Sequence, residues 1–158
     1  MADLWLTPDQ QRAWLAFMRV QLRMNYEINR QLQTDSGLSS TDYDVLTALS
    51  TDPDGRRTIS SLANLIGWER SRVSHHIRRM ERRNLLTHAP SPKDRRATEV
   101  TLTAEGWETL RAAAPAHVAQ VRALFFEGLP AELLTPLSEA LENVYAHILA
   151  NGTLPPPD

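Results

Sequence analysis

Positive charge is concentrated in one part of the chain, between Arg56 and Arg96. That stretch holds 11 arginine and lysine residues against three acidic ones, a net charge of +8. The remainder holds six basic and 16 acidic residues, a net charge of −10. Ten of the 11 basic residues are arginine, whose planar fork suits phosphate groups and guanine edges. The overall charge of −2 therefore conceals a basic lobe on an acidic body, which favours a polyanionic partner.

The residues that carry this charge predict two helices and a hairpin. Ser60 is expected to cap a short helix that Gly67 ends with a turn. The next helix, from about Arg70 to Asn84, has a narrow apolar stripe and places arginines on its other faces. Two strand-like runs, residues 85–89 and 98–102, flank a basic tip stiffened by proline. This order is the layout of a winged helix-turn-helix, in which the second helix enters the major groove of DNA.

Candidate DNA contacts follow from this layout. On the recognition helix they are Arg70, Ser71, Arg72, Ser74, His75, Arg78 and Arg79. On the wing they are Lys93, Arg95 and Arg96, because arginine at such a tip suits the narrow, electronegative minor groove. Residues near the start of a recognition helix usually read base edges, and here these are Arg70, Ser71, Ser74, His75 and Arg78. Arg79, Arg82 and Arg83 are expected to grip phosphates, and Arg72 fits either role. The simpler alternative is a solvated basic face without a partner.

Long amphipathic helices are expected on both sides of the lobe, which spans about residues 38–103. The first, about residues 8–34, has Thr7 as its cap, and Ser39 with Asp42 starts a shorter helix after it. Residues 51–57 are expected to be a polar loop. The second long region, about residues 104–150, starts at Thr103, and Pro115 is expected to bend or interrupt it. The fold class is thus mainly α with a small β-hairpin wing, in one domain over residues 1–158, with a disordered or extended tail at 152–158.

Apolar residues of the first helix cover more than one face, which suggests that it packs against a helix of a second chain. The terminal helices are therefore expected to form a homodimer. Packing within the same chain is the alternative.

Several classes of function are not supported by the sequence. The chain has no cysteine, no apolar run long enough to span a bilayer and no basic, apolar leader at its N-terminus, so a cytoplasmic protein is expected. It lacks a glycine-rich phosphate loop, a Cys/His pair and a Gly-x-Ser-x-Gly turn, so no enzyme is expected. His75 and His76 are adjacent and point about 100° apart on a helix, so no metal site or cofactor is expected.

The run ERSRVSHHIRRMERRNLL followed by SPKDRRATEVTLTAEG resembles the multiple-antibiotic-resistance regulator (MarR) family of bacterial transcription factors. The resemblance extends over essentially the whole chain. Its most specific part is Asp94, Arg95 and Arg96 followed by residues 100–103 and Gly106. One departure is Glu69, which stands where related sequences usually have a serine or threonine cap and to which no role is assigned.

The resemblance implies a triangular homodimer with two winged lobes. By position, Arg95 or Arg96 is the minor-groove arginine, and Asp94 orients the wing through salt bridges to nearby arginines. Many relatives bind small aromatic acids between base and lobe, where the lining candidates here are Trp14, Arg23, Tyr26 and Tyr43. His117 and Pro115 lie where regulation enters.

The expected function is a sequence-specific regulator of transcription that binds double-stranded DNA. It is expected to be a ligand-responsive repressor that acts as a homodimer on a palindromic operator. The alternative is a winged-helix interaction module that binds an acidic protein.

Overall fold

The computed structural model describes residues 5–158. The sequence prediction that the N-terminus is not an export leader includes residues 1–4, which lie outside that range. In chain order the elements are α1 (Pro8–Ser36), α2 (Ser40–Ser50), β1 (Arg56–Thr58), α3 (Ile59–Ile66), α4 (Arg70–Glu81), β2 (Leu86–Pro90), β3 (Thr98–Leu102), α5 (Ala104–Val121), the π-helical turn η1 (Arg122–Phe126), the 3-10 turn η2 (Ala131–Leu133) and α6 (Leu134–Asn151). This order confirms a mainly helical winged helix-turn-helix with a small antiparallel sheet.

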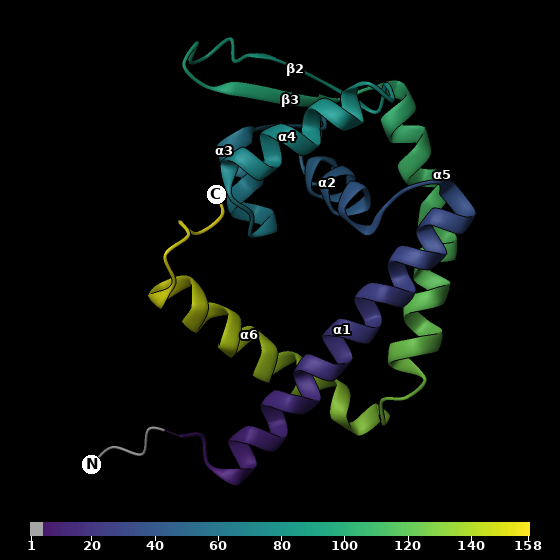
Figure 1. The fold of residues 1–158 in the computed structure, drawn as a ribbon, viewed down its shortest axis with the longest axis vertical. Coiled ribbons are helices and arrows are strands. Elements are labelled where there is room, and N and C mark those ends of the chain that lie inside the picture. The colour runs from purple at the N-terminus through teal and green to yellow at the C-terminus, as the bar shows by residue number, and fades with distance from the viewer. Residues whose placement is uncertain (1–4) are drawn as a thin grey trace.

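The lobe consists of α2, α3 and α4 packed under a three-stranded antiparallel sheet of order β1-β3-β2 (Figure 1). Its core is continuous, and every buried apolar side chain of the described residues belongs to it. Leu32 of α1 and Ala113 of α5 extend this core toward the helical base, which consists of α1, α5 and α6. Sixteen buried apolar residues in one cluster give the lobe a fixed shape, so α4 and the wing are held in one relative position.

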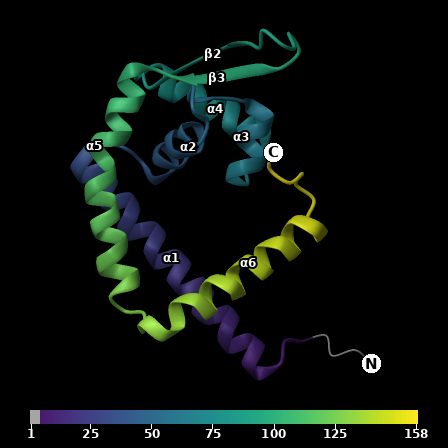
Figure 2. The same cartoon turned by 180° about the vertical axis from the view of Figure 1, so that it is seen from behind.

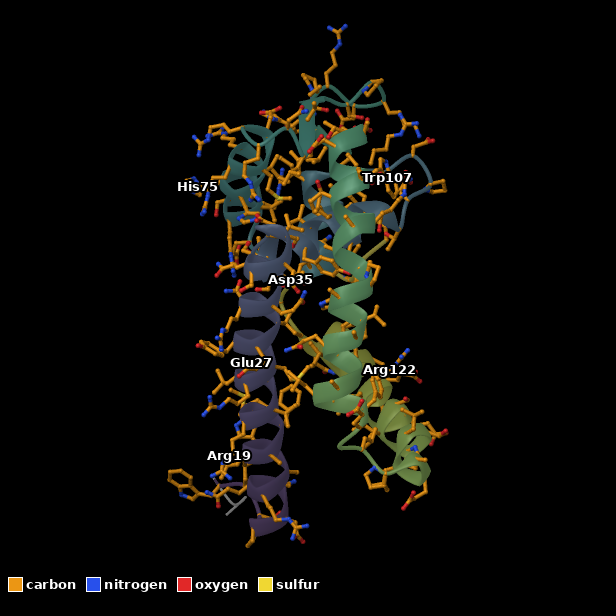
Figure 3. The ribbon with its side chains drawn as sticks, turned by 90° about the vertical axis from the view of Figure 1, so that its right-hand side faces the viewer. Arg19, Glu27, Asp35, His75, Trp107 and Arg122 are labelled. Atoms are coloured by element: carbon orange, nitrogen blue, oxygen red, sulfur yellow. The ribbon has the colours of Figure 1, made fainter. Side chains whose placement is uncertain are left out.

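The helical base is long and open. α1 and α5 lie side by side, and α6 crosses away from them toward the far side of the molecule (Figures 1 and 2). Figure 3 shows the paired α1 and α5 edge on, with the lobe at one end. α6 contains no buried residue. Within the described part of the chain, all the exposed large apolar side chains belong to the two terminal regions and none to the lobe.

Three helix starts agree with the sequence predictions. Thr7 caps α1 and forms a reciprocal capping box with Gln10. Ser39 and Asp42 form the same box at the start of α2, and the Thr103 hydroxyl accepts the amide of Gly106 at the start of α5. In each case a short polar side chain satisfies an amide that the helix leaves free.

Two boundaries of the lobe were predicted wrongly. The cap of α3 is Thr58, whose hydroxyl accepts the Ser61 amide, so the helix starts before Ser60. α4 ends at Glu81, three residues before Asn84. Asn84 adopts a left-handed conformation (φ 57°), and its carbonyl accepts the Thr103 hydroxyl at 2.6 Å, so the chain turns into β2 there.

The polar loop expected at residues 51–57 contains the start of a strand. Asp52 Oδ1 accepts the amides of Asp54 and Arg56, and Gly55 turns with a left-handed φ of 65°. The Gly55 carbonyl accepts the Leu102 amide at 2.9 Å, which aligns β1 with β3. The three residues of β1 are all polar, so they gave no alternating pattern from which this strand could be predicted.

Pro115 does not interrupt α5, which continues to Val121 before the π-helical turn. Proline removes one amide donor from the helix. The packing of α5 against α1 holds the helix together across this missing hydrogen bond.

Candidate nucleic-acid interface

The recognition helix α4 has one face in the core and one face in solvent. Val73, His76, Ile77 and Met80 are buried. At about 100° per residue, the opposite face is centred on Ser71, His75, Arg78 and Arg82, all of which are exposed. Figure 3 shows His75 at the outer edge of the lobe. This face is therefore free to enter a groove, and it includes Arg82 beside the residues predicted to read bases.

The remaining candidates on α4 flank this face. Arg79 is exposed next to it, and Arg70 and Arg72 lie on opposite flanks. The Arg72 guanidinium stacks on the Trp68 ring at 3.9 Å from its centroid, a cation–π contact that fixes its direction. The Ser74 hydroxyl donates to the Arg70 carbonyl at 2.9 Å. The Ser74 side chain is half-buried, and its hydrogen bond lies within its own helix.

The wing tip is shaped by its own backbone. The Ser91 amide donates to the Ala97 carbonyl at 2.8 Å, and the Ala97 amide donates to the Asp94 carbonyl. Asp94 Oδ1 accepts the Arg96 amide at 2.9 Å. No described residue forms a salt bridge with Asp94, so the expected ion pairs to arginines are absent and the carboxylate holds the turn through an amide instead. Lys93, Arg95 and Arg96 are exposed on this turn.

Arg83 belongs to the fold and not to the phosphate contacts expected for it. Its guanidinium donates to Asp42 Oδ2 at 2.7 Å and to the Gly37 carbonyl at 2.9 Å. His76 Nε2 lies 2.9 Å from Asp42 Oδ1, although the ring is not aligned for a hydrogen bond. These contacts tie the middle of the recognition helix and the turn that follows it to the capping box of α2. The correction arises because partners 41 residues apart leave no local pattern.

Burial raises the pKa of Asp42, but His76, the Ser39 amide and Arg83 stabilise the carboxylate and together hold its pKa well below the ordinary value of 3.8. Because the folded-state pKa is depressed, the stabilisation is fully present above the ordinary pKa. It is lost as the pH falls through the folded-state value.

Replacing Asp42 with alanine should destabilise the protein by about 3 kcal/mol at pH 7, because Arg83 and the buried His76 lose their partner. The difference from the unmodified protein should shrink at pH 3. Urea unfolding at both pH values measures it. Asp35→Ala, which removes an exposed carboxylate bonded only to Gln31, is the control and should change stability by less than about 0.5 kcal/mol. An equal loss at both pH values would contradict the charge argument.

Two further arginines of the basic stretch are engaged inside the lobe. Arg57 donates to the Ala48 carbonyl and to the hydroxyls of Ser61 and Thr51. Arg56 pairs with Asp54. The charge available to a polyanion therefore comes from α4 and the wing.

A cleft of about 750 Å³ lies where α1, α2 and α5 meet the turn before α4. Its walls include Tyr43, Asp44, Trp68, Arg72 and His117. The Tyr43 and His117 rings pack with centroids 4.4 Å apart. Three aromatic rings and one guanidinium around an open cleft suit a flat ligand with a negative group.

Ionisable groups in this cleft are perturbed by their surroundings. Burial lowers the pKa of His117, and nearby Asp44 partly offsets this. Asp44 reaches water at the mouth of the cleft, yet desolvation by the surrounding atoms raises its pKa. His117 Nδ1 is buried without a hydrogen-bond partner in the described residues.

Of the four residues predicted to line an effector pocket, only Tyr43 lines this cleft. α1 meets α2 at Asn29, whose side chain accepts the Ser40 amide. Trp14 lies 15 residues earlier, about 22 Å along the helix, so it cannot reach the cleft of its own chain. Arg23 and Tyr26 also do not line it. Trp68, Asp44 and Arg72 were missed because they meet only after α3 and α4 fold against α2.

Two other features are absent from residues 5–158. There, no helix combines the length and hydropathy needed to cross a bilayer. Nor do three or more histidine, aspartate or glutamate side chains gather closely enough to hold a metal ion.

The lobe, with an outward basic helix and a basic hairpin beside it, defines a winged helix-turn-helix DNA-binding protein. The model described as MarR family matches residues 36–97. The chain is similar to AbsC, a MarR family transcriptional regulator from Streptomyces coelicolor, at 37% identity over 93% of this chain and 99% of that one, with a TM-score of 0.86. The chain therefore belongs to the MarR family. It is a DNA-binding transcriptional regulator and not an enzyme.

Two further structures are similar. Sco3205 from Streptomyces coelicolor, a MarR family regulator solved in complex with DNA, is 32% identical over 96% of this chain and 99% of that one, with a TM-score of 0.88. CouR from Rhodococcus jostii RHA1, solved with p-coumaroyl-CoA, is 23% identical over 87% and 91%, with a TM-score of 0.71. No curated protein sequence in the comparison matches the chain.

Proposed function

We propose that the protein acts as a homodimer that binds a near-palindromic operator. The observation that supports the dimer is the distribution of apolar surface. The lobe buries its large apolar side chains, whereas α1, η1 and α6 expose theirs. Large exposed apolar side chains gathered on the terminal helices are typical of a surface that another chain covers. A second copy of the chain, which carries the same faces, covers them symmetrically.

Each protomer places α4 in a major groove and its wing in the adjoining minor groove. Ser71, His75 and Arg78 lead into the groove, with Arg70, Arg72, Ser74 and Arg79 at its margins. Lys93, Arg95 and Arg96 reach the minor groove, and Asp94 sets the turn that carries them. Two such lobes related by a twofold axis fit half-sites about one helical turn, roughly 10 bp, apart. The DNA complex of the similar Sco3205 supports this mode.

The same proposal extends to regulation. The dimer acts as a repressor, because two lobes on one operator occlude that DNA, and a small aromatic anion releases it by binding the cleft. The cleft walls support this ligand class, as does the ligand held by CouR. A ligand that favours one lobe position shifts the population toward it and so changes the fit to successive grooves.

A gel shift on duplex DNA across a salt series tests DNA binding directly. With about four phosphates neutralised per protomer, the log–log slope of the binding constant against salt should be about −7. Binding to a random-sequence duplex is expected at low salt, and a duplex selected from a random pool should bind more tightly. A nearly flat salt response would contradict the charge argument. No binding at low salt would favour an acidic protein as the partner of the basic face.

A further inference from the structure

The C-terminal tail, residues 153–158, returns to the lobe. After α6 it reaches the turn between α3 and α4, and Figures 1 and 2 show the C-terminus beside α3, across the molecule from paired α1 and α5. Tail residues Thr153, Leu154 and Pro155 line a hollow of about 500 Å³, and its opposite wall includes Trp68 and Arg70. Leu154 is half-buried, although almost all of α6 is exposed. The tail thus lies across this hollow from the residues that lead into the recognition helix.

Gly152 determines the direction in which the tail leaves α6. Its amide donates to the Ile148 carbonyl at 2.7 Å, and its backbone is extended (φ −76°, ψ 174°). A Cβ at this position would lie 2.7 Å from the Ile148 oxygen, closer than real Cβ contacts. A side chain here would therefore change the path of the tail as it leaves α6.

The tail sequence is suited to hold two parts of the molecule at a fixed distance. Pro155, Pro156 and Pro157 follow one another, so their φ angles are fixed and the segment is stiff without internal hydrogen bonds. Little conformational entropy is lost when such a segment is held between two bodies. A flexible tail of the same length would tether the lobe but would not hold it in place.

We propose that the tail is a strut that fixes the lobe against the helical base at the entrance to the recognition helix. The lobe is joined to the base on one side by α1 and α5. The strut supplies a second connection on the opposite side, through Leu154 at the α3–α4 turn. It restricts the swing of the two lobes, and hence the half-site spacings that the dimer accepts. The effect on spacing rests on the proposed dimer, whereas the connection itself does not.

Spin labels measure this swing without DNA. The chain has no cysteine, so Thr87→Cys, on an exposed position of β2, gives one label per protomer. The distance distribution between the two labels should be narrow in the full chain. It should widen about twofold in a chain that stops at Gly152, and also in Gly152→Ala, while light scattering still finds a dimer. Asp158→Asn, which removes tail charge but keeps the prolines, is the control and should match the full chain.

An unchanged width in both variants would overturn the strut. Tighter DNA binding by the truncated chain at unchanged width would also overturn it, because the tail would then only obstruct DNA. If light scattering finds monomers, the proposed dimer fails. The strut is then tested by the distribution of distances between labels at Arg12→Cys and Thr87→Cys in one chain. The same widening on truncation is then expected, and its absence counts against the strut.

Discussion

Replacing Val144 and Ile148 of α6 together with aspartate should yield a monomer that no longer binds its operator. Both side chains expose 56% of their surface in the single chain, and Leu141 and Tyr145 extend the same face at 45% and 51%. Burying two carboxylates in an apolar interface costs far more than the interface regains. The lobe should keep its fold because α6 contributes nothing to the buried core.

The loss of DNA binding follows from geometry. In the dimer, one bound lobe holds the second next to its half-site, so the second binding event occurs at a high effective concentration. Without this linkage, affinity should fall by at least about 10²-fold. Light scattering reads the oligomeric state, a gel shift the affinity and circular dichroism the helix content.

Glu139→Ala is the matched control for this prediction. Glu139 lies about 160° around α6 from Leu141, so its substitution alters the same helix on its opposite side. It should leave dimer and binding unchanged. If the double variant stays dimeric, the pairing surface lies elsewhere on the exposed apolar residues of α1 and η1.

Local patterns predicted local structure well. The capping residues Thr7, Ser39 and Thr103 each act on an amide three residues ahead, so a short window of sequence contains the whole interaction. The same holds for the apolar stripe of α4 and for the turn at Gly67, whose φ of 72° favours glycine. The fold class follows from these elements in order.

Interactions between distant residues were not accessible in this way. Sequence counts Arg57, Arg83 and Arg78 as equal contributors to a basic face. Only the fold shows that Arg57 bonds to α2, α3 and the loop between α2 and β1. It also shows that Arg83 bonds to Asp42, whereas Arg78 is exposed to solvent. Composition therefore overestimated the charge offered to DNA and still located the lobe correctly.

The prediction of the residues that line an effector pocket was mostly wrong for the same reason. Trp14 and Tyr26 of α1 were candidates because they are aromatic, whereas the cleft is lined by Trp68 and His117, which lie 49 positions apart in sequence. Neither residue belongs to a periodic pattern that would set it apart from an ordinary core side chain.

Arg96→Ala should weaken operator binding without affecting the fold. The Arg96 side chain is exposed, and in the described structure it has neither a hydrogen bond nor an ion pair. Only its backbone amide, which alanine retains, supports the wing turn through Asp94. A lost minor-groove contact costs about 1 to 3 kcal/mol, so two wings together should cost about 2 to 6 kcal/mol, at least roughly a 30-fold loss of affinity.

Two further variants separate charge from shape. Arg111→Ala removes the same charge from α5, away from α4 and the wing, and should change affinity little. Arg96→Lys keeps the charge but loses the planar fork, so its affinity should fall between those of alanine and arginine. Equal losses for Arg96→Ala and Arg111→Ala would mean that only net charge acts. A lower melting temperature or a lost dimer in Arg96→Ala would instead show that the side chain supports the fold. Another residue would then have to contact the minor groove, and Arg95 has the nearest exposed guanidinium on the same turn.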